Sequence, residues 1–173
     1  MKKTFFALML MLVSVVTIKA QTLTSNPWMT VLPGNDDVVV LLSFDNDGTC
    51  ALVIANEEVQ EEDVMKLTIT VTAMIPGAYT LNGDNLNIKL DKEKADLNFD
   101  YEIEGVDGQA KKMVEAMLKP ELEKQKPEMK KEILQDLPLS SLETIKVVSI
   151  DKEKLVLADD SGQEMTFVPA PEN

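Results

Sequence analysis

The chain has 173 residues, with 30 acidic residues against 17 basic ones and a formal net charge of −13. It contains no histidine and every basic residue is lysine, so it lacks the Ser–His or Cys–His pair that activates a nucleophile and lacks imidazole metal ligands. An acidic surface repels phosphate backbones, which excludes nucleic acid as an expected partner.

The first 20 residues have the pattern of a cleavable secretory signal. Lys2 and Lys3 give the positive start, residues 5–18 carry no charge, and Ala20 is a small residue suited to the cleavage position. The uncharged stretch is shorter than the roughly 20 residues that span a bilayer. We therefore expect an exported protein, periplasmic or extracellular, with no stable membrane insertion after cleavage. Residues 21–173 are expected to form one folded domain.

A β-hairpin is the first element expected after the signal. Residues 38–44 (VVVLLSF) and 49–55 (TCALVIA) are apolar and rich in β-branched side chains, and the turn sequence DNDG at 45–48 separates them. DNDG also resembles part of a calcium loop, but the closing position would be Ile54 rather than an acid, so a turn is expected. The acidic residues at 57–63 are expected to form a loop.

Alternation of apolar and polar residues predicts further strands at 66–73, 86–90 and 96–104. The Pro-Gly pair at 76–77 is expected to separate the first of these from a short strand at 78–81. Several short strands joined by tight turns are typical of an antiparallel meander that closes into a barrel or folds as a sandwich.

Residues 106–137 change to helical spacing. Pro120 and Pro127 are expected to divide this insert into two or three helical pieces, because proline lacks the backbone donor that an interior turn needs. The apolar face of the insert is expected to pack inside the protein. The alternative is an adaptable face that binds a partner or a second copy. That face comprises Met113, Met117, Leu122 and Met129.

Strands are expected again after the insert, at 142–150, 155–158 and 165–168, with turns at 151–154 and 159–162. The acidic residues of the chain fall in turns or at outward strand positions, where nothing excludes water or raises a carboxyl pKa. We therefore expect no pair of carboxylates to act as a glycosidase-type catalyst. A non-enzymatic protein without a cofactor is the expectation.

The hairpin predicted at 38–55 is apolar on both faces, whereas the strands at 66–73 and 96–104 have one polar face. Apolar outer surface of this extent is seldom left uncovered on a soluble monomer. We expect the helical insert to lie over this hairpin or across an end of the barrel. A homodimer through the same surface is the alternative. Cys50, the single cysteine, lies in this hairpin and is expected to be buried rather than to link two chains.

The order of the elements resembles that of the small lipocalin-like proteins that bacteria export. The matching features are Trp28 near the start, SFDNDGT at 43–49, GAYTL at 77–81 followed by NLNI at 85–88, and KLVL at 154–157 followed by GQEMTF at 162–167. The chain departs from lipocalins in having Asn26 where they have glycine, and in lacking the arginine that they stack on the tryptophan. The resemblance implies a mainly β fold, an antiparallel meander closed into a lipocalin-like barrel, with the helical insert before the last strands.

The expected function is that of a non-catalytic binding protein, monomer or homodimer, with a small apolar ligand inside the barrel. The residues expected to line the interior are Trp28, Leu67, Ile69, Tyr79, Phe99, Tyr101 and Met165. The alternative is a structural or interaction protein with a solid core, which would bind a partner through the Met/Leu face of the insert.

Overall fold

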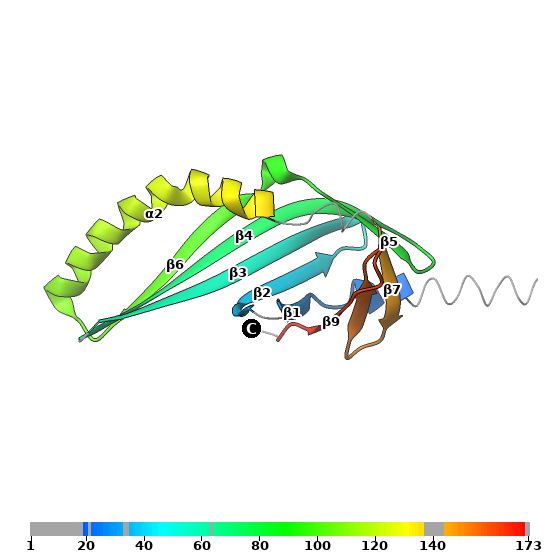
Figure 1. Ribbon diagram of the computed structural model, residues 1–173, viewed down its shortest axis with the longest axis horizontal. Coiled ribbons are helices and arrows are strands. Elements are labelled where there is room, and N and C mark those ends of the chain that lie inside the picture. Colours follow the sequence, from blue (N-terminus) through cyan, green and yellow to red (C-terminus); the bar gives the residue numbers. More distant parts are fainter. Residues whose placement is uncertain (1–18, 21, 33–34, 63, 137–143, 172–173) are drawn as a thin grey trace, which may run out of the picture.

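The structure is a computed structural model that describes residues 19–20, 22–32, 35–62, 64–136 and 144–171 (Figure 1). The signal predicted over residues 1–20 lies outside these ranges except at its last two residues, so it stays a prediction. Among the described residues, no helix is both long and apolar enough to cross a membrane.

Nine antiparallel strands and one long helix make up the described fold. The strands are β1 (Trp28–Leu32), β2 (Asn35–Phe44), β3 (Thr49–Glu62), β4 (Met65–Asn82), β5 (Asn85–Leu90), β6 (Asp96–Glu104), β7 (Ile145–Ile150), β8 (Leu155–Ala158) and β9 (Glu164–Pro169). Helix α2 (Gly108–Asp136) lies between β6 and β7, and a single 3₁₀ turn, η1 (Lys92–Lys94), lies between β5 and β6.

Eight of these strands close into a barrel. Each of β1 to β4 pairs with the strand that follows it. β5 then pairs with β7, β7 with β8, β8 with β9, and β9 returns to pair with β1. The meander is therefore up-and-down, interrupted once between β5 and β7. The predicted closed antiparallel barrel with a helical insert before the last strands is confirmed.

An arm of three strands projects from this barrel. We define the arm as residues 57–62 of β3, residues 65–74 of β4 and the whole of β6. β4 is 18 residues long, and it pairs with β5 from Gly77 onward but with β6 up to Met74. Figure 1 shows β3, β4 and β6 extending together beyond the other strands. The strand predicted at 96–104 exists, but it adds to β4 outside the barrel.

Two predicted breaks in these strands are wrong. Residues 57–62 continue β3 rather than form a loop, because they pair with β4 and their glutamates lie exposed in an edge strand. β4 also runs through Pro76 and Gly77. Pro76 pairs with neither β5 nor β6, so its missing N–H interrupts neither ladder. A Cβ atom at Gly77 would lie 2.4 Å from the Lys89 carbonyl oxygen, so glycine permits the close approach of β5.

The insert is a single helix of 29 residues, not two or three pieces. Pro120 and Pro127 both lie within it, on exposed positions. Figure 1 shows α2 bowed, with its convex side away from the strands. A bend of this kind accommodates proline because the hydrogen bonds on the solvent side of a helix are the ones that lengthen.

One face of β3 and β4 serves two hydrophobic cores. At the barrel end, Leu52 of β3 pairs with Ile75 of β4, and both are buried in the barrel core. Farther along the same face of β4, Leu67 and Ile69 are buried in a separate cluster with Ile103 of β6. Helix α2 covers this second cluster, which we call the arm core.

Helix α2 is fastened to β6 by lysines as well as by the arm core. Near its start, the Lys111 ammonium donates to the Ile103 carbonyl oxygen over 3.3 Å, and Lys119 lies 5.8 Å from the centre of the Tyr101 ring. These contacts cover part of the free edge of β6, which an exposed strand would otherwise offer for pairing.

The other end of α2 reaches the barrel. The Lys130 ammonium donates to the Ala95 carbonyl oxygen, and the Lys126 ammonium lies 3.6 Å from the Asp96 carboxylate. Leu134 then packs against the barrel core. Of the two expected placements of the insert, the one over the 38–55 hairpin is wrong, because α2 follows β6 on the inner face. The placement across the barrel is met only in part, since only the C-terminal end of α2 meets the barrel.

Candidate interaction surface

In the part of the chain that the structure describes, buried side chains pack together in the barrel interior and form its core. Leu23, Trp28, Ile75 and Leu155 are all 0% exposed, and the Trp28 indole N–H donates to the Leu23 carbonyl oxygen over 2.8 Å. The side chains that line a ligand cavity, typically 300 Å³ or more, would have surface that a water molecule inside the cavity can touch. These four residues have no such surface.

Two other residues predicted for the interior also lie against the barrel core. Met165 and Tyr79 are partly buried there. The Tyr79 hydroxyl donates to the Asp45 carbonyl oxygen over 2.9 Å, and its ring meets Phe44 edge-on with centroids 5.0 Å apart. Burial, and next the Asp45 charge, raise the pKa of Tyr79. Tyr79 therefore anchors the turn between β2 and β3.

The remaining predicted interior residues lie outside the barrel. Leu67 and Ile69 are buried in the arm core, and Tyr101 packs against it. Phe99 is half-buried and belongs to neither core. The predicted inward direction of Leu67 and Ile69 is correct, but their predicted neighbours are wrong. This first part of β4 lies in the arm, and the strand joins the barrel only farther along.

The four residues predicted as an interaction face of the insert do not act as one face. Leu122 packs against the arm core. Met113 and Met117 are instead 63% and 64% exposed, and Met129 is half-buried beside the helix surface. The predicted packing inside the protein therefore holds for Leu122, whereas Met113 and Met117 are accessible to solvent.

The DNDG sequence forms the predicted hairpin turn. The Asp45 N–H donates to the Thr49 carbonyl oxygen over 2.9 Å, and Gly48 adopts the left-handed conformation with φ 87°. The Thr49 hydroxyl donates to the Asp47 carboxylate over 2.6 Å, and this bond holds the pKa of Asp47 below its usual value. Among the described residues, no group of three or more acids and cysteines is placed to hold a metal ion.

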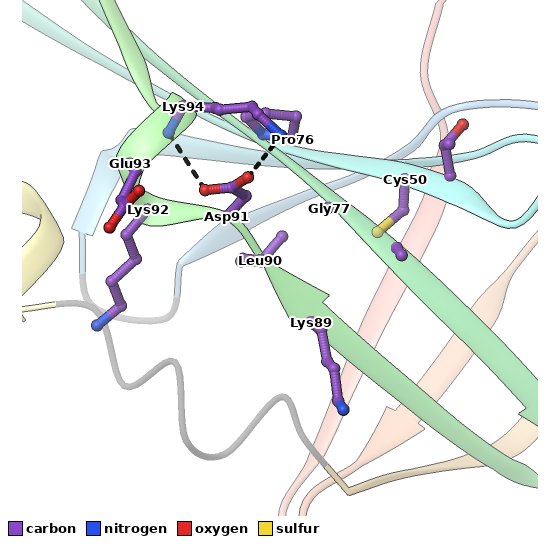
Figure 2. Close-up of a pocket in the computed structure, with 11 residues that line it drawn as sticks. Cys50, Pro76, Gly77, Lys89, Leu90, Asp91, Lys92, Glu93 and Lys94 are labelled. Carbon is purple, nitrogen blue, oxygen red and sulfur yellow. Dashed lines mark hydrogen bonds and ion pairs between the residues drawn. The ribbon is translucent and has the colours of Figure 1, made fainter.

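An open groove lies where β4 changes neighbours. Its volume is about 910 Å³, and Cys50, Gly77 and Leu90 lie along it beneath the segment that carries η1. Figure 2 shows the Lys94 ammonium directed at the Asp91 carboxylate across this segment, 2.8 Å away. Lys94 is one of three lysines that line the groove, with Lys89 and Lys92, and it is paired with an acid of its own turn.

The Cys50 thiol in this groove is not poised for chemistry. It is 5% exposed. Burial, and next the charge of Asp45, raise the pKa of the thiol to about 11. Because the thiolate is the nucleophile, Cys50 stays in its unreactive form at neutral pH. The prediction of a buried thiol is confirmed.

The outer face of the barrel carries an uninterrupted row of apolar side chains, which we call the apolar row. It crosses five neighbouring strands through direct register pairs, in the order β9, β1, β2, β3 and β4. Its members are Val168, Met29, Leu41, Val53 and Met74. Neither core includes any of them, because their neighbours along each strand, such as Trp28, Leu42 and Leu52, are the ones that point inward.

A second apolar line runs beside the row. Val31 of β1 pairs with Val39 of β2, which pairs with Ala55 of β3. The rims of this patch are open, since Val31, Met74 and Val168 are 42%, 45% and 46% exposed. The sequence had signalled this surface through the hairpin that is apolar on both faces. The helix expected to cover this surface does not do so, because α2 lies on the opposite face of β4.

Neither a scan of protein-family models nor a search of curated proteins gave a match to this chain.

Proposed function

We propose that this protein is an exported, non-catalytic barrel of lipocalin-like type that acts by binding another protein through the apolar row. The observation that carries the proposal is the row itself, five apolar side chains in register on the outside of a closed barrel. Scattered exposed apolar residues are normal on soluble proteins, but a contiguous apolar patch is typical of an interaction site.

The filled interior supports this proposal over the binding of a small apolar ligand. Trp28 and Leu23 belong to the barrel core, and their side chains are fully buried. A ligand would have to displace core side chains that are close-packed, at the expense of their mutual contacts. On this view the barrel is a rigid scaffold that holds the outer face in shape.

Site-specific photo-crosslinking in cells that export the protein tests the proposal. A photoreactive residue in place of Met29, inside the apolar row, should give a discrete adduct with another protein. The matched control carries the same residue at Glu123, an exposed position of α2, which covers the inner face of the arm. The adduct should disappear when Leu41→Lys is added. Equal labelling at both positions, or an adduct that survives Leu41→Lys, would count against the proposal.

Native mass spectrometry of protein purified from the same cells tests the ligand alternative. The proposal requires that no small-molecule mass is added to that of the polypeptide. A stoichiometric small-molecule mass that is lost with Trp28→Phe would restore the interior as the binding site.

A further inference from the structure

The charges beside the apolar row indicate what kind of protein surface fits it. Beyond the second apolar line, the outer face of the sheet continues onto the arm. There, Glu57 pairs with Thr70, which pairs with Asp100, and the next outward position of β6 is Glu102. All the acids of this face are exposed. They are Glu57, Glu61, Asp96, Asp100, Glu102 and Glu104. We call them the acidic border.

The acidic border is nearly unopposed on its own face. Lys66 is the one outward lysine of β4 in the arm, and its ammonium lies 3.8 Å from the Glu104 carboxylate. Lys126 approaches Asp96 but comes from α2 on the inner face. The field of the remaining carboxylates therefore extends outward, where an incoming partner meets it.

The opposite side of the apolar row carries less charge, because an uncharged line comes first and only the turn acids Asp45 and Asp47 lie beyond it. The next outward line there consists of Ser43, Ala51 and Pro76, paired directly across β2, β3 and β4. The surface is thus asymmetric along the strands. It passes from uncharged residues, through the apolar row, to the acidic border.

Resting on the proposed function, we propose that the occupant of this face is a protein segment with an apolar strip and lysine or arginine residues that face the acidic border. Apolar burial would supply most of the affinity, and the charges would supply orientation and association rate. A second copy of this chain is disfavoured, because it brings another net charge of −13 to the same contact.

Three synthetic heptapeptides test this inference on the full chain by fluorescence anisotropy. All three have serine at positions 2, 4 and 6, so that positions 1, 3, 5 and 7 share one face of an extended strand. The leucine–lysine peptide has leucine at positions 1 and 3 and lysine at positions 5 and 7. The leucine–glutamate peptide replaces both lysines by glutamate, and the serine–lysine peptide replaces both leucines by serine. The leucine–lysine peptide should bind at least about tenfold more tightly than either of the others, a difference of about 1.4 kcal/mol.

Variants locate the binding. Leu41→Ser should weaken the leucine–lysine peptide about tenfold, consistent with the loss of a buried apolar contact. Glu57→Gln with Asp100→Asn should weaken it about fivefold at low salt, and this difference should shrink at 0.5 M salt. The matched control, Glu123→Gln with Glu132→Gln, removes the same charge from exposed positions of α2, which covers the inner face, and should leave binding unchanged.

The possible failures are distinguishable. If the leucine–glutamate peptide binds as well as the leucine–lysine peptide and both respond to Leu41→Ser, the docking face stands and the basic partner is wrong. If the serine–lysine peptide binds equally well, or if Leu41→Ser has no effect, the apolar row is not a docking face and the proposed function falls with it. A dimer in sedimentation velocity that Leu41→Ser dissolves would replace the basic partner with a second copy.

Discussion

The barrel core and the arm core lie along one face of the same long strand, yet they are enclosed in different ways. Strands close the barrel on all sides, and residues such as Ile75 and Leu155 are fully buried. The arm core has three strands below and one helix above. Its buried members are Leu67, Ile69 and Ile103, and a ring of half-buried side chains surrounds them.

The two cores therefore differ in how firmly they are held. A side chain in the barrel can be exposed only if the sheet opens, whereas the arm core is exposed as soon as α2 lifts. Regions with few buried apolar contacts open at lower free energy than the main core. We therefore expect α2 to exchange its amide hydrogens through local opening, and the barrel strands to exchange theirs only through global unfolding.

The largest expected effect comes from emptying the barrel. Trp28→Ala should lower the free energy of unfolding by about 3–5 kcal/mol, the usual range for removing a fully buried large aromatic side chain. Urea denaturation followed by far-ultraviolet circular dichroism measures the change. Trp28→Phe keeps most of the volume but loses the hydrogen bond to Leu23, so its loss should be clearly smaller. Equal losses of unfolding free energy in the two variants would show that the volume of the Trp28 side chain does not fill space in the barrel core.

A middle-sized effect should separate the two cores. Leu118→Ala removes an α2 side chain that packs on the arm core. It should lower the local opening free energy of α2 by about 1–2 kcal/mol, less than a full core deletion because Leu118 is half-buried. Hydrogen exchange with mass spectrometry should show faster exchange in α2 and unchanged protection in β8. Faster exchange in both would mean that the two cores unfold as one unit.

A smaller effect should follow the ionisation of Cys50 on the barrel side. The folded thiol has its pKa raised from 9.0 to about 11, by burial first and the Asp45 charge second. Above pH 9 the unfolded chain loses this proton before the folded one, so stability falls as the pH rises from about 9 toward about 11. Cys50→Ala should flatten this part of the stability profile relative to the natural chain. Identical slopes in the two proteins would show that the thiol is not responsible.

The alternation of residue types predicted which side chains of a strand point inward, but it did not predict which strands and side chains lie next to them. The period of two residues in KLTITVTA places Leu67 and Ile69 on the inner face, as found. It cannot say where along β4 the barrel ends and the arm begins. That boundary depends on the change of partner from β6 to β5 near Gly77, which is a long-range contact.

Local residue preferences favour the wrong structure at two other places. The glutamates of residues 57–62 favour a loop, but pairing with β4 makes them an edge strand whose charges stay in solvent. Pro120 and Pro127 favour separate helices, but both are exposed on a bowed helix. In each case, tertiary pairing or packing outweighs a preference of about 1–3 kcal/mol per residue.

The apolar row could be predicted only in part, for the same reason. The hairpin that is apolar on both faces signalled an outer surface that needs a partner. Identifying its cover required knowing which face of the sheet α2 takes. Lysines help to decide this, since Lys111 and Lys130 reach backbone carbonyls beside β6. Those contacts depend on three-dimensional positions that no local pattern encodes.

The smallest expected effect tests whether lysines fasten the arm more than packing does. Lys126→Met keeps the aliphatic part of the side chain and removes the ion pair with Asp96. Because Asp96 is more than half exposed, the change should cost the local stability of α2 no more than about 0.5 kcal/mol. Hydrogen exchange of α2 at low and at 0.5 M salt should show a difference only at low salt, since salt screens the natural pair as well. If Lys126→Met instead opened α2 as much as Leu118→Ala does, the arm would be held chiefly by charge, and the contrast between its core and that of the barrel would be one of interaction type rather than of depth.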